Sequence, residues 1–313
     1  MSKQSVALQE NAKANSLRRS NSIMGSAFFG PALVLLILFL FLPMLLTLVF
    51  SFTDFFALDP TRTHFVGLEN FLSLFGDDIF VAAFLNTLKF VVIIVPLQLL
   101  LALGLALFIN RITYCKTYFK IAFFVPVVMS LAVVSTLWMQ IYSPEGIFNS
   151  LLGHLGIAPQ PFIYSADQAL PSIAFMSIWQ GAGYQMLIFL GGLTAINPNL
   201  YEAAEMDHAN AWQKFWHVTI PQLKPITIFV FISITIGAFR MIVQPMVMTG
   251  GGPAHSTYTM IYDIYETGTV NWEIGLSSAA AIIFVIFVVI ITIIQNILTK
   301  EREPGSKKKK GGV

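Results

Sequence analysis

The chain has 313 residues, of which 56% are hydrophobic and only 11% are charged, and its formal net charge is +2. This composition excludes an ordinary soluble globular domain and predicts an integral membrane protein. The apolar runs are continuous rather than alternating, which excludes a β-barrel and favours an all-α bundle.

Six apolar segments are long enough to cross a hydrocarbon core of roughly 30 Å, which takes about 20 helical residues. Residues 1–22 and 299–313 are polar tails, and the first apolar run is too long for a signal-peptide core, so we expect it to remain as an uncleaved helix. The membrane domain, residues 23–298, is therefore predicted to contain six transmembrane helices: Ile23–Phe50, Val81–Ile109, Ile121–Tyr142, Leu170–Ile196, Ile226–Thr249 and Ile274–Leu298.

The distribution of basic residues predicts the orientation of these spans. Fifteen of the 18 Lys and Arg residues lie in the tails and the even-numbered connections, whereas the opposite loops hold only Arg62 together with ten of the 16 acids. Because basic connections are retained in the cytoplasm, both termini and residues 197–225 are expected there. The one cysteine, Cys115, falls in a cytoplasmic connection and cannot form an internal disulfide.

The fourth span carries a stripe of small and hydrogen-bonding residues in "SIWQGAGYQMLIFLGGL". Ser177, Gly181, Tyr184 and Ile188 recur at helical spacing and share one face. Glycines let a ligand approach the backbone, and a tyrosine ring suits a sugar, so this face is a candidate binding surface. Close packing between helices would explain the glycines equally well.

The fifth span contains an arginine, Arg240, which is costly inside a membrane and therefore needs a partner, a cavity or the outer interface. Spacing supports an interior face, because one side of a helix carries Gly237, Arg240, Met241, Gln244 and Met248. The alternative is that Arg240 pairs with a neighbouring subunit or extends to the outer interface.

The sequence lacks the signatures of an enzyme. It contains no His, Cys and carboxylate cluster with metal-ligand spacing, no catalytic serine motif and no P-loop. If the chain moves a solute at the expense of ATP, the ATPase must be another chain.

The cytoplasmic stretch "INPNLYEAAEMDHANAWQKFWHVTIPQLKP" predicts two short helices joined by a turn. Asn197 can cap the first helix, Pro198–Met206, and Asn210 can cap the second, which runs to about Thr219. Two prolines, Pro221 and Pro225, are expected to end the second helix and lead the chain into the fifth span. The simplest interpretation from the pattern alone is an amphipathic connector.

This stretch resembles the EAA motif of ABC-importer permeases, in which E-A-A is followed by D-G-A, a phenylalanine and later prolines. The matching residues are Glu202, Ala203, Ala204, Asp207, Ala209, Phe215, Pro221 and Pro225. Other segments are similar to the carbohydrate-uptake branch of that family, the maltose, oligosaccharide and glycerol-3-phosphate type: "NTLKFVV", "AFFVP", "WQGAGYQM" and "TGGGPAHST".

The resemblance implies a type I ABC-importer permease bundle in the bacterial plasma (inner) membrane, importing a sugar or sugar derivative. It implies that the loop docks on the ATPase through Glu202, Ala203, Ala204 and Asp207, followed in the turn by His208 and Ala209. It also implies that the fourth and fifth spans line the solute site. Together with the stripes above, the predicted substrate pathway is Ser177, Gly181, Tyr184, Gly237, Ala238, Arg240, Met241 and Gln244.

The partners implied are a second homologous permease subunit, a cytoplasmic ABC ATPase dimer, an extracellular or periplasmic solute-binding protein and membrane lipid, with no nucleic acid. No cofactor is expected on this chain, because ATP and Mg would bind the partner ATPase. His208 departs from the motif, which has glycine there, and this puts in question how closely the loop approaches its partner. Two other functions remain open: an ion-coupled secondary transporter, which would need intramembrane carboxylates, and a non-transporting membrane docking protein.

Overall fold

The computed structural model describes residues 29–299, and this part of the chain is helical apart from its loops and one isolated bridge between Thr53 and Phe65. The predicted N-terminal tail, residues 23–28 of the first predicted span and residues 300–313 of the predicted C-terminal tail lie outside the described residues. Within residues 29–299, five helices are long and apolar enough to cross a membrane, or six if one bent pair is counted as a single span.

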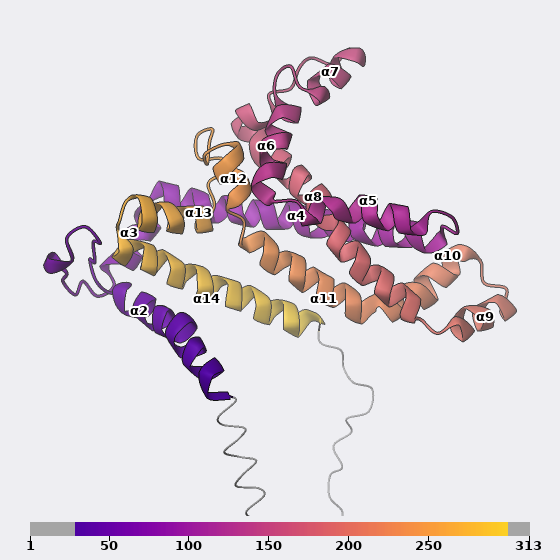
Figure 1. The fold of residues 1–313 in the computed structure, drawn as a ribbon, viewed down its shortest axis with the longest axis horizontal. Coiled ribbons are helices and arrows are strands. Elements are labelled where there is room, and N and C mark those ends of the chain that lie inside the picture. Colours follow the sequence, from indigo (N-terminus) through magenta and orange to yellow (C-terminus); the bar gives the residue numbers. More distant parts are fainter. Residues whose placement is uncertain (1–28, 300–313) are drawn as a thin grey trace, which may run out of the picture.

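Figure 1 shows the long helices side by side, with α6 and α7 projecting from one side and α9 at one end. The first span is Phe29–Phe50, which includes the π-helical turn η1 (Ile37–Phe41) and α2 (Leu42–Phe50). The other elements follow in order: η2 (Pro60–Arg62), α3 (Glu69–Gly76), α4 (Asp78–Arg111), α5 (Lys116–Val128), α6 (Leu131–Tyr142), α7 (Ile147–His154), η3 (Phe162–Tyr164), α8 (Ala166–Ala195), α9 (Pro198–Met206), α10 (Ala211–Lys214), η4 (Phe215–Thr219), α11 (Ile220–Phe239), α12 (Val243–Met248), α13 (Met260–Tyr265), η5 (Glu266–Val270) and α14 (Ile274–Thr299).

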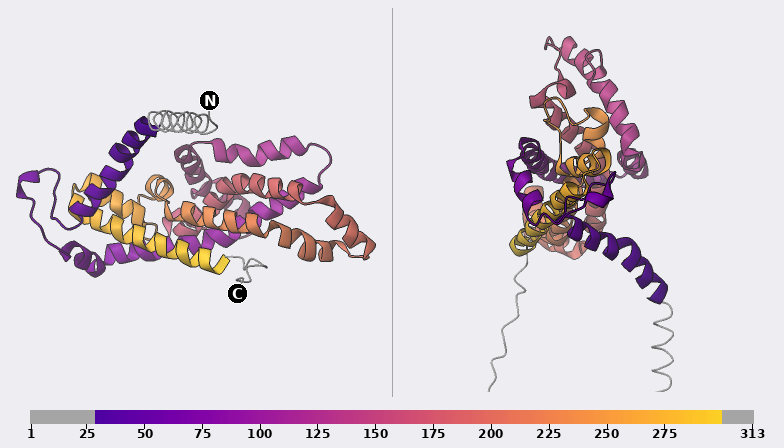
Figure 2. Two further views of the ribbon diagram at one scale, coloured as in Figure 1. Left: turned by 90° about the horizontal axis from the view of Figure 1, so that it is seen from below. Right: turned by 90° about the vertical axis from the view of Figure 1, so that its left-hand side faces the viewer.

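The main core lies between α4, α8 and α11. Small side chains allow the first two of these helices to run close together: Ala102 and Ala106 of α4 and Ala174 of α8 are completely buried. A second cluster joins α14 to α3, α4 and α13 around Phe80 and Met260. The first span contacts α14 through α2 but diverges from the bundle toward its N-terminal end (Figures 1 and 2), and no residue of its most apolar 18-residue window is buried.

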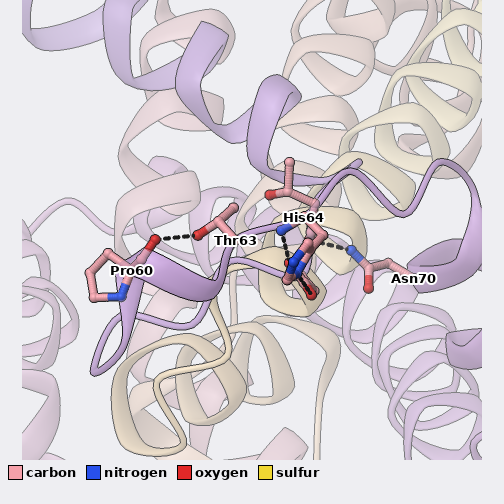
Figure 3. A network of polar contacts seen from close by, with 6 residues as sticks. Pro60, Thr63, His64 and Asn70 are labelled. Carbon is pink, nitrogen blue, oxygen red and sulfur yellow. Dashed lines mark hydrogen bonds and ion pairs between the residues drawn. The ribbon is translucent and has the colours of Figure 1, made fainter.

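The loop between the first span and α3 is fixed by side-chain contacts (Figure 3). Asp54 accepts a hydrogen bond from the backbone N–H of His64 and lies 3.3 Å from that residue's Nδ1. The donated N–H lowers the pKa of the Asp54 carboxyl from its ordinary value. The Asn70 amide, on α3, donates to the carbonyl of Thr53 at 2.8 Å and to that of Ser51 at 3.1 Å. These two hydrogen bonds hold the end of the loop against its beginning.

The third predicted span, Ile121–Tyr142, is not one helix. It divides into α5 and α6, which are bent by 98° at Met129 and Ser130. Neither of these residues has helical backbone angles, and Gln180 of α8 donates to the carbonyl of Pro126 one turn earlier. The apolar pattern continued through the bend and gave no sign of it.

The fifth predicted span, Ile226–Thr249, does not coincide with one helix at either end. The helix begins at Ala211 and continues through Pro221 and Pro225 to Phe239. The π-helical turn η4 shifts the hydrogen-bond pattern, with the Ile220 N–H donating to the Phe215 carbonyl, so Pro221 enters the first turn of α11, where its missing N–H is tolerated. The two prolines therefore do not end the second helix predicted for residues 197–225.

At its other end the fifth helix stops before Arg240, and the predicted stripe does not lie on one continuous helix face. The break falls before Pro245, whose ring would clash with the carbonyl of Met241 in an undistorted helix, although a proline alone does not force a break, since α11 passes through Pro225. In the structure Pro245 lies in the first turn of α12, and the freed Met241 carbonyl accepts a 2.9 Å hydrogen bond from the Thr259 hydroxyl. A side chain thus satisfies the backbone where the helix is interrupted.

Candidate functional site

The first candidate site is the helical hairpin formed by α9, α10 and η4. Helix α9 covers Pro198–Met206, the range expected from the sequence, and the Asn197 side chain caps it by accepting the Asn199 N–H at 3.0 Å. Asn210 caps α10 in a reciprocal capping box with Gln213. Each helix therefore has its N-terminus fixed by its own sequence.

The turn after α9 is a Schellman motif with histidine in the position usually taken by glycine. His208 has φ of 57°, its N–H donates to the Glu205 carbonyl at 3.0 Å, and the Ala209 N–H donates to the Ala204 carbonyl at 2.9 Å. The left-handed backbone that the glycine of the motif would adopt is thus kept by a residue that tolerates it less well.

Two contacts hold the helices of the hairpin together. Lys214 forms a 2.9 Å ion pair with Glu205, and the Tyr201 hydroxyl lies 2.9 Å from the hydroxyl of the buried Thr219. Sequence reasoning missed both pairs, because their partners are 9 and 18 residues apart and follow no helical spacing. The hairpin is consequently one unit, and it continues without interruption into α11.

The structure divides the six predicted coupling residues into two groups. Four of them line a hollow of about 320 Å³ between the two arms of the hairpin: Ala204, Asp207, His208 and Ala209. Glu202 and Ala203 lie outside this hollow, on the exposed surface of α9. Helices α9 and α10 lie at one end of the bundle (Figure 1), so the hairpin presents its exposed alanine and its hollow there.

The second candidate site comprises the predicted pathway residues of α8 and of the break after α11. Ser177 is buried, donates to the Ile173 carbonyl, and has the amide of Gln244 at 3.4 Å from its hydroxyl. Gly181 lies against the side-chain amide of Gln98, which donates to Gln185 at 3.1 Å. These contacts form a buried polar line between α4, α8 and α12.

The remaining pathway residues lie at different depths. Ala238 and Met241 are buried, so their side chains face the bundle, whereas Gly237 and Arg240 are exposed at the end of α11. Tyr184 is 48% exposed midway along α8. The ion pairs within residues 29–299 do not include Arg240.

The loop of the "TGGGPAHST" segment is anchored by polar residues of α4 that sequence reasoning did not assign to it. Asn86 donates to the carbonyls of His255 and Tyr258 at 2.7 and 3.1 Å, and the Thr87 hydroxyl accepts the Met260 N–H at 3.0 Å. These side chains form hydrogen bonds with backbone groups of a loop that has no regular secondary structure. Their buried position is explained by this support of the loop.

Residues 20–303 match the family described as "Binding-protein-dependent transport system inner membrane component". The chain belongs to this family. As a family member it is a transmembrane permease subunit of an ABC transporter, a class that does not itself carry out catalysis.

Curated relatives agree with this assignment. The permease is 32% identical to the sn-glycerol-3-phosphate transport system permease protein UgpA of Agrobacterium fabrum, over 85% of this chain and 90% of the relative. It is 33% identical to the lactose transport system permease protein LacF of Rhizobium radiobacter, over 87% of this chain and 91% of the relative.

A solved structure shares the fold. It is the crystal structure of a bacterial alginate ABC transporter in complex with an alginate pentasaccharide-bound periplasmic protein, and one of its chains superposes with a TM-score of 0.79 at 21% identity, covering 91% of this permease and 96% of that chain. At this identity the likeness establishes the fold of the bundle.

Proposed function

We propose that this permease forms half of the translocation pathway of an ATP-driven importer for a sugar or sugar derivative. The observation that carries the proposal is the α9–α10 hairpin. Its first helix exposes small side chains and is joined by an ion pair to the long helix that leads to the predicted pathway. Two relatives named for glycerol-3-phosphate and lactose transport support the solute class.

In this proposal α9 docks on a cytoplasmic ATPase, one of two in the complex, which binds ATP and Mg. The contact is made by the exposed Glu202 and Ala203 and by the residues of the hollow. Both chain termini lie on the same cytoplasmic side, as the charge distribution favours. Closure of the ATPases moves the hairpin, and the bundle then opens outward to receive solute.

On the solute side, the exposed pathway residues Tyr184, Gly237 and Arg240 face a second permease subunit across the pathway, and the buried ones support them. A solute-binding protein delivers the solute to the outer loops. The Tyr184 ring offers a flat surface for a sugar, and the Arg240 guanidinium offers charge to an anionic group.

Uptake by proteoliposomes tests the proposal. The permease, the subunits that copurify with it and a binding protein are reconstituted, and uptake of radiolabelled lactose and glycerol-3-phosphate is measured with and without internal ATP. We expect ATP-dependent uptake of at least one probe. Uptake that follows an ion gradient without ATP would contradict the proposal, as would an absence of uptake for all sugars tested with a complete set of subunits.

A matched pair of variants tests the docking face. Ala203→Phe places a bulky ring on the exposed face of α9 and should lower ATP-dependent uptake about tenfold or more, equivalent to roughly 1.4 kcal/mol. Gln222→Phe adds the same ring at an exposed position of α11 and should leave uptake near the wild-type level. Equal uptake by the two variants would remove α9 from the contact.

A further inference from the structure

A groove lies where the end of α4 meets α10 and η4, at the same end of the bundle as α9 (Figure 1). Its volume is about 720 Å³, and it is lined by Gly104, Phe108, Arg111, Trp212 and Phe215 among others. It is separate from the hollow of the hairpin, with which it shares no lining residue.

The floor of the groove is apolar and open. Gly104 has no atom within 4 Å of the position that a Cβ would occupy, so the glycine leaves space above the surface of α4. Phe108 is 48% exposed and Trp212 is 68% exposed, which leaves two aromatic rings of the lining uncovered. Exposing such an apolar surface to water is unfavourable, so an apolar ligand is expected to cover it.

One end of the groove carries a positive charge. Arg111 closes α4, is exposed, and takes no part in the ion pairs found within residues 29–299. Its guanidinium has a planar fork of donors that matches a phosphate group. Trp212 lies beside it, and tryptophan is typical of the headgroup level of a bilayer.

We propose that this groove binds an anionic phospholipid, with an acyl chain over Gly104 and the phosphate on Arg111. An apolar slot that ends in a single guanidinium at the limit of a membrane span complements a lipid in both polarity and charge. Lys116 and Lys120 follow in the first turns of α5, so the local surface attracts anionic headgroups. The proposal rests on the helices spanning a membrane and does not depend on which solute is transported.

Fluorescence quenching by brominated lipids tests the proposal. The full-length chain, in the complex in which it is isolated, is placed in nanodiscs with increasing fractions of brominated phosphatidylglycerol or brominated phosphatidylcholine. Subtracting the signal of Trp212→Phe isolates the Trp212 component. We expect half-maximal quenching at about fivefold less phosphatidylglycerol than phosphatidylcholine, a ratio that corresponds to the roughly 1 kcal/mol contributed by one basic residue at an anionic surface.

Three variants separate a built site from general attraction. Arg111→Gln should abolish the preference for phosphatidylglycerol, whereas Lys116→Gln removes the same charge outside the groove and should retain it. Gly104→Leu fills the open floor and should weaken quenching by both lipids; Gly104→Ala is the milder version if that variant does not fold. Equal quenching by both lipids in the wild type would overturn the proposal. So would loss of quenching in the complex but not in the separated chain, which would indicate that a partner subunit covers the groove.

Discussion

His208 holds a backbone conformation that side chains with a Cβ rarely adopt, with φ of 57° in the turn that closes α9. We expect His208→Gly to keep the turn and to retain copurification of the ATPase. His208→Val should destabilise the hairpin by about 1–2 kcal/mol, because a β-branched residue fits this region poorly. Thermal unfolding measures the stability of each variant, and copurification measures its binding to the ATPase.

Gln222→Val is the control, since Gln222 is exposed on α11, outside the hollow, and has no positive φ. A loss of transport by a fully stable His208→Gly variant would instead show that the imidazole itself contacts the ATPase.

Arg240 is exposed at the end of α11 and has no ion pair within the described part of the chain, so its removal should cost little stability. We expect Arg240→Gln to lower uptake of glycerol-3-phosphate about tenfold while leaving lactose uptake nearly unchanged, because a guanidinium contributes roughly 1.5–3 kcal/mol to a charged hydrogen bond. Arg240→Lys keeps the positive charge and should retain part of the glycerol-3-phosphate uptake that Arg240→Gln loses. An equal loss for both solutes would indicate a structural role.

Asp263 is a carboxylic acid buried to 5% exposure in α13, between the fifth and sixth candidate spans. Burial raises its pKa from 3.8 to about 6, and the nearby carboxylates of Asp77 and Glu266 act in the same direction. The folded state therefore holds this proton more tightly than the unfolded state, so stability falls as pH rises from about 4 through 6. Melting temperatures measured from about pH 4 to 6 should fall less steeply with rising pH in Asp263→Asn than in the wild type. An unchanged slope would show that other groups cause it.

At the scale of helices, the contact between α8 and α5 depends on Gly183, whose missing side chain leaves room for the backbone carbonyl of Phe123. Gly183→Leu should destabilise the bundle by about 1–3 kcal/mol, because neither backbone can move aside easily. Gly191→Leu, at an exposed position of the same helix with no atom within 4 Å, should have little effect. Unfolding in detergent compares the two, and similar melting temperatures would contradict this account of the packing.

Local sequence was sufficient for the elements whose determinants are local. The caps at Asn197 and Asn210 and the extent of α9 follow from neighbouring residues, and α14 follows from one uninterrupted apolar run. The break after Phe239 could not be predicted, because Pro245 permits either a kink or a new helix. What favours the new helix is Thr259, which lies 18 residues from the Met241 carbonyl it satisfies.

The same limit applied to the candidate sites. Spacing along a helix identified Ser177, Gly181 and Gln244. It did not show that Ser177 meets Gln244, or that Gly181 meets Gln98, because these partners lie on other helices. Spacing also placed Arg240 and Met241 on the same face. Because the helix is interrupted there, Arg240 is exposed and Met241 is buried. A periodic pattern reports which residues share a face only while the helix continues.

At the scale of the whole molecule, the exposed Cys115 offers a native probe of orientation. A membrane-impermeant maleimide should label it in inside-out vesicles and not in right-side-out vesicles, because its connection is basic. Leu155→Cys in a Cys115→Ser background places the thiol at an exposed position beside α7 and should reverse the result. Labelling of both positions from one side would overturn the predicted topology.

The continuity of the helix from Ala211 to Phe239 has a mechanical consequence. Its 29 residues span roughly 43 Å, so the α9–α10 hairpin sits at one end of a stiff lever and Arg240 follows at the other. A small tilt imposed at the hairpin becomes a displacement of several ångströms at the far tip, without a flexible joint to absorb it. The prolines within this lever and its π-helical turn then set its curvature, and hence the direction in which the tip travels.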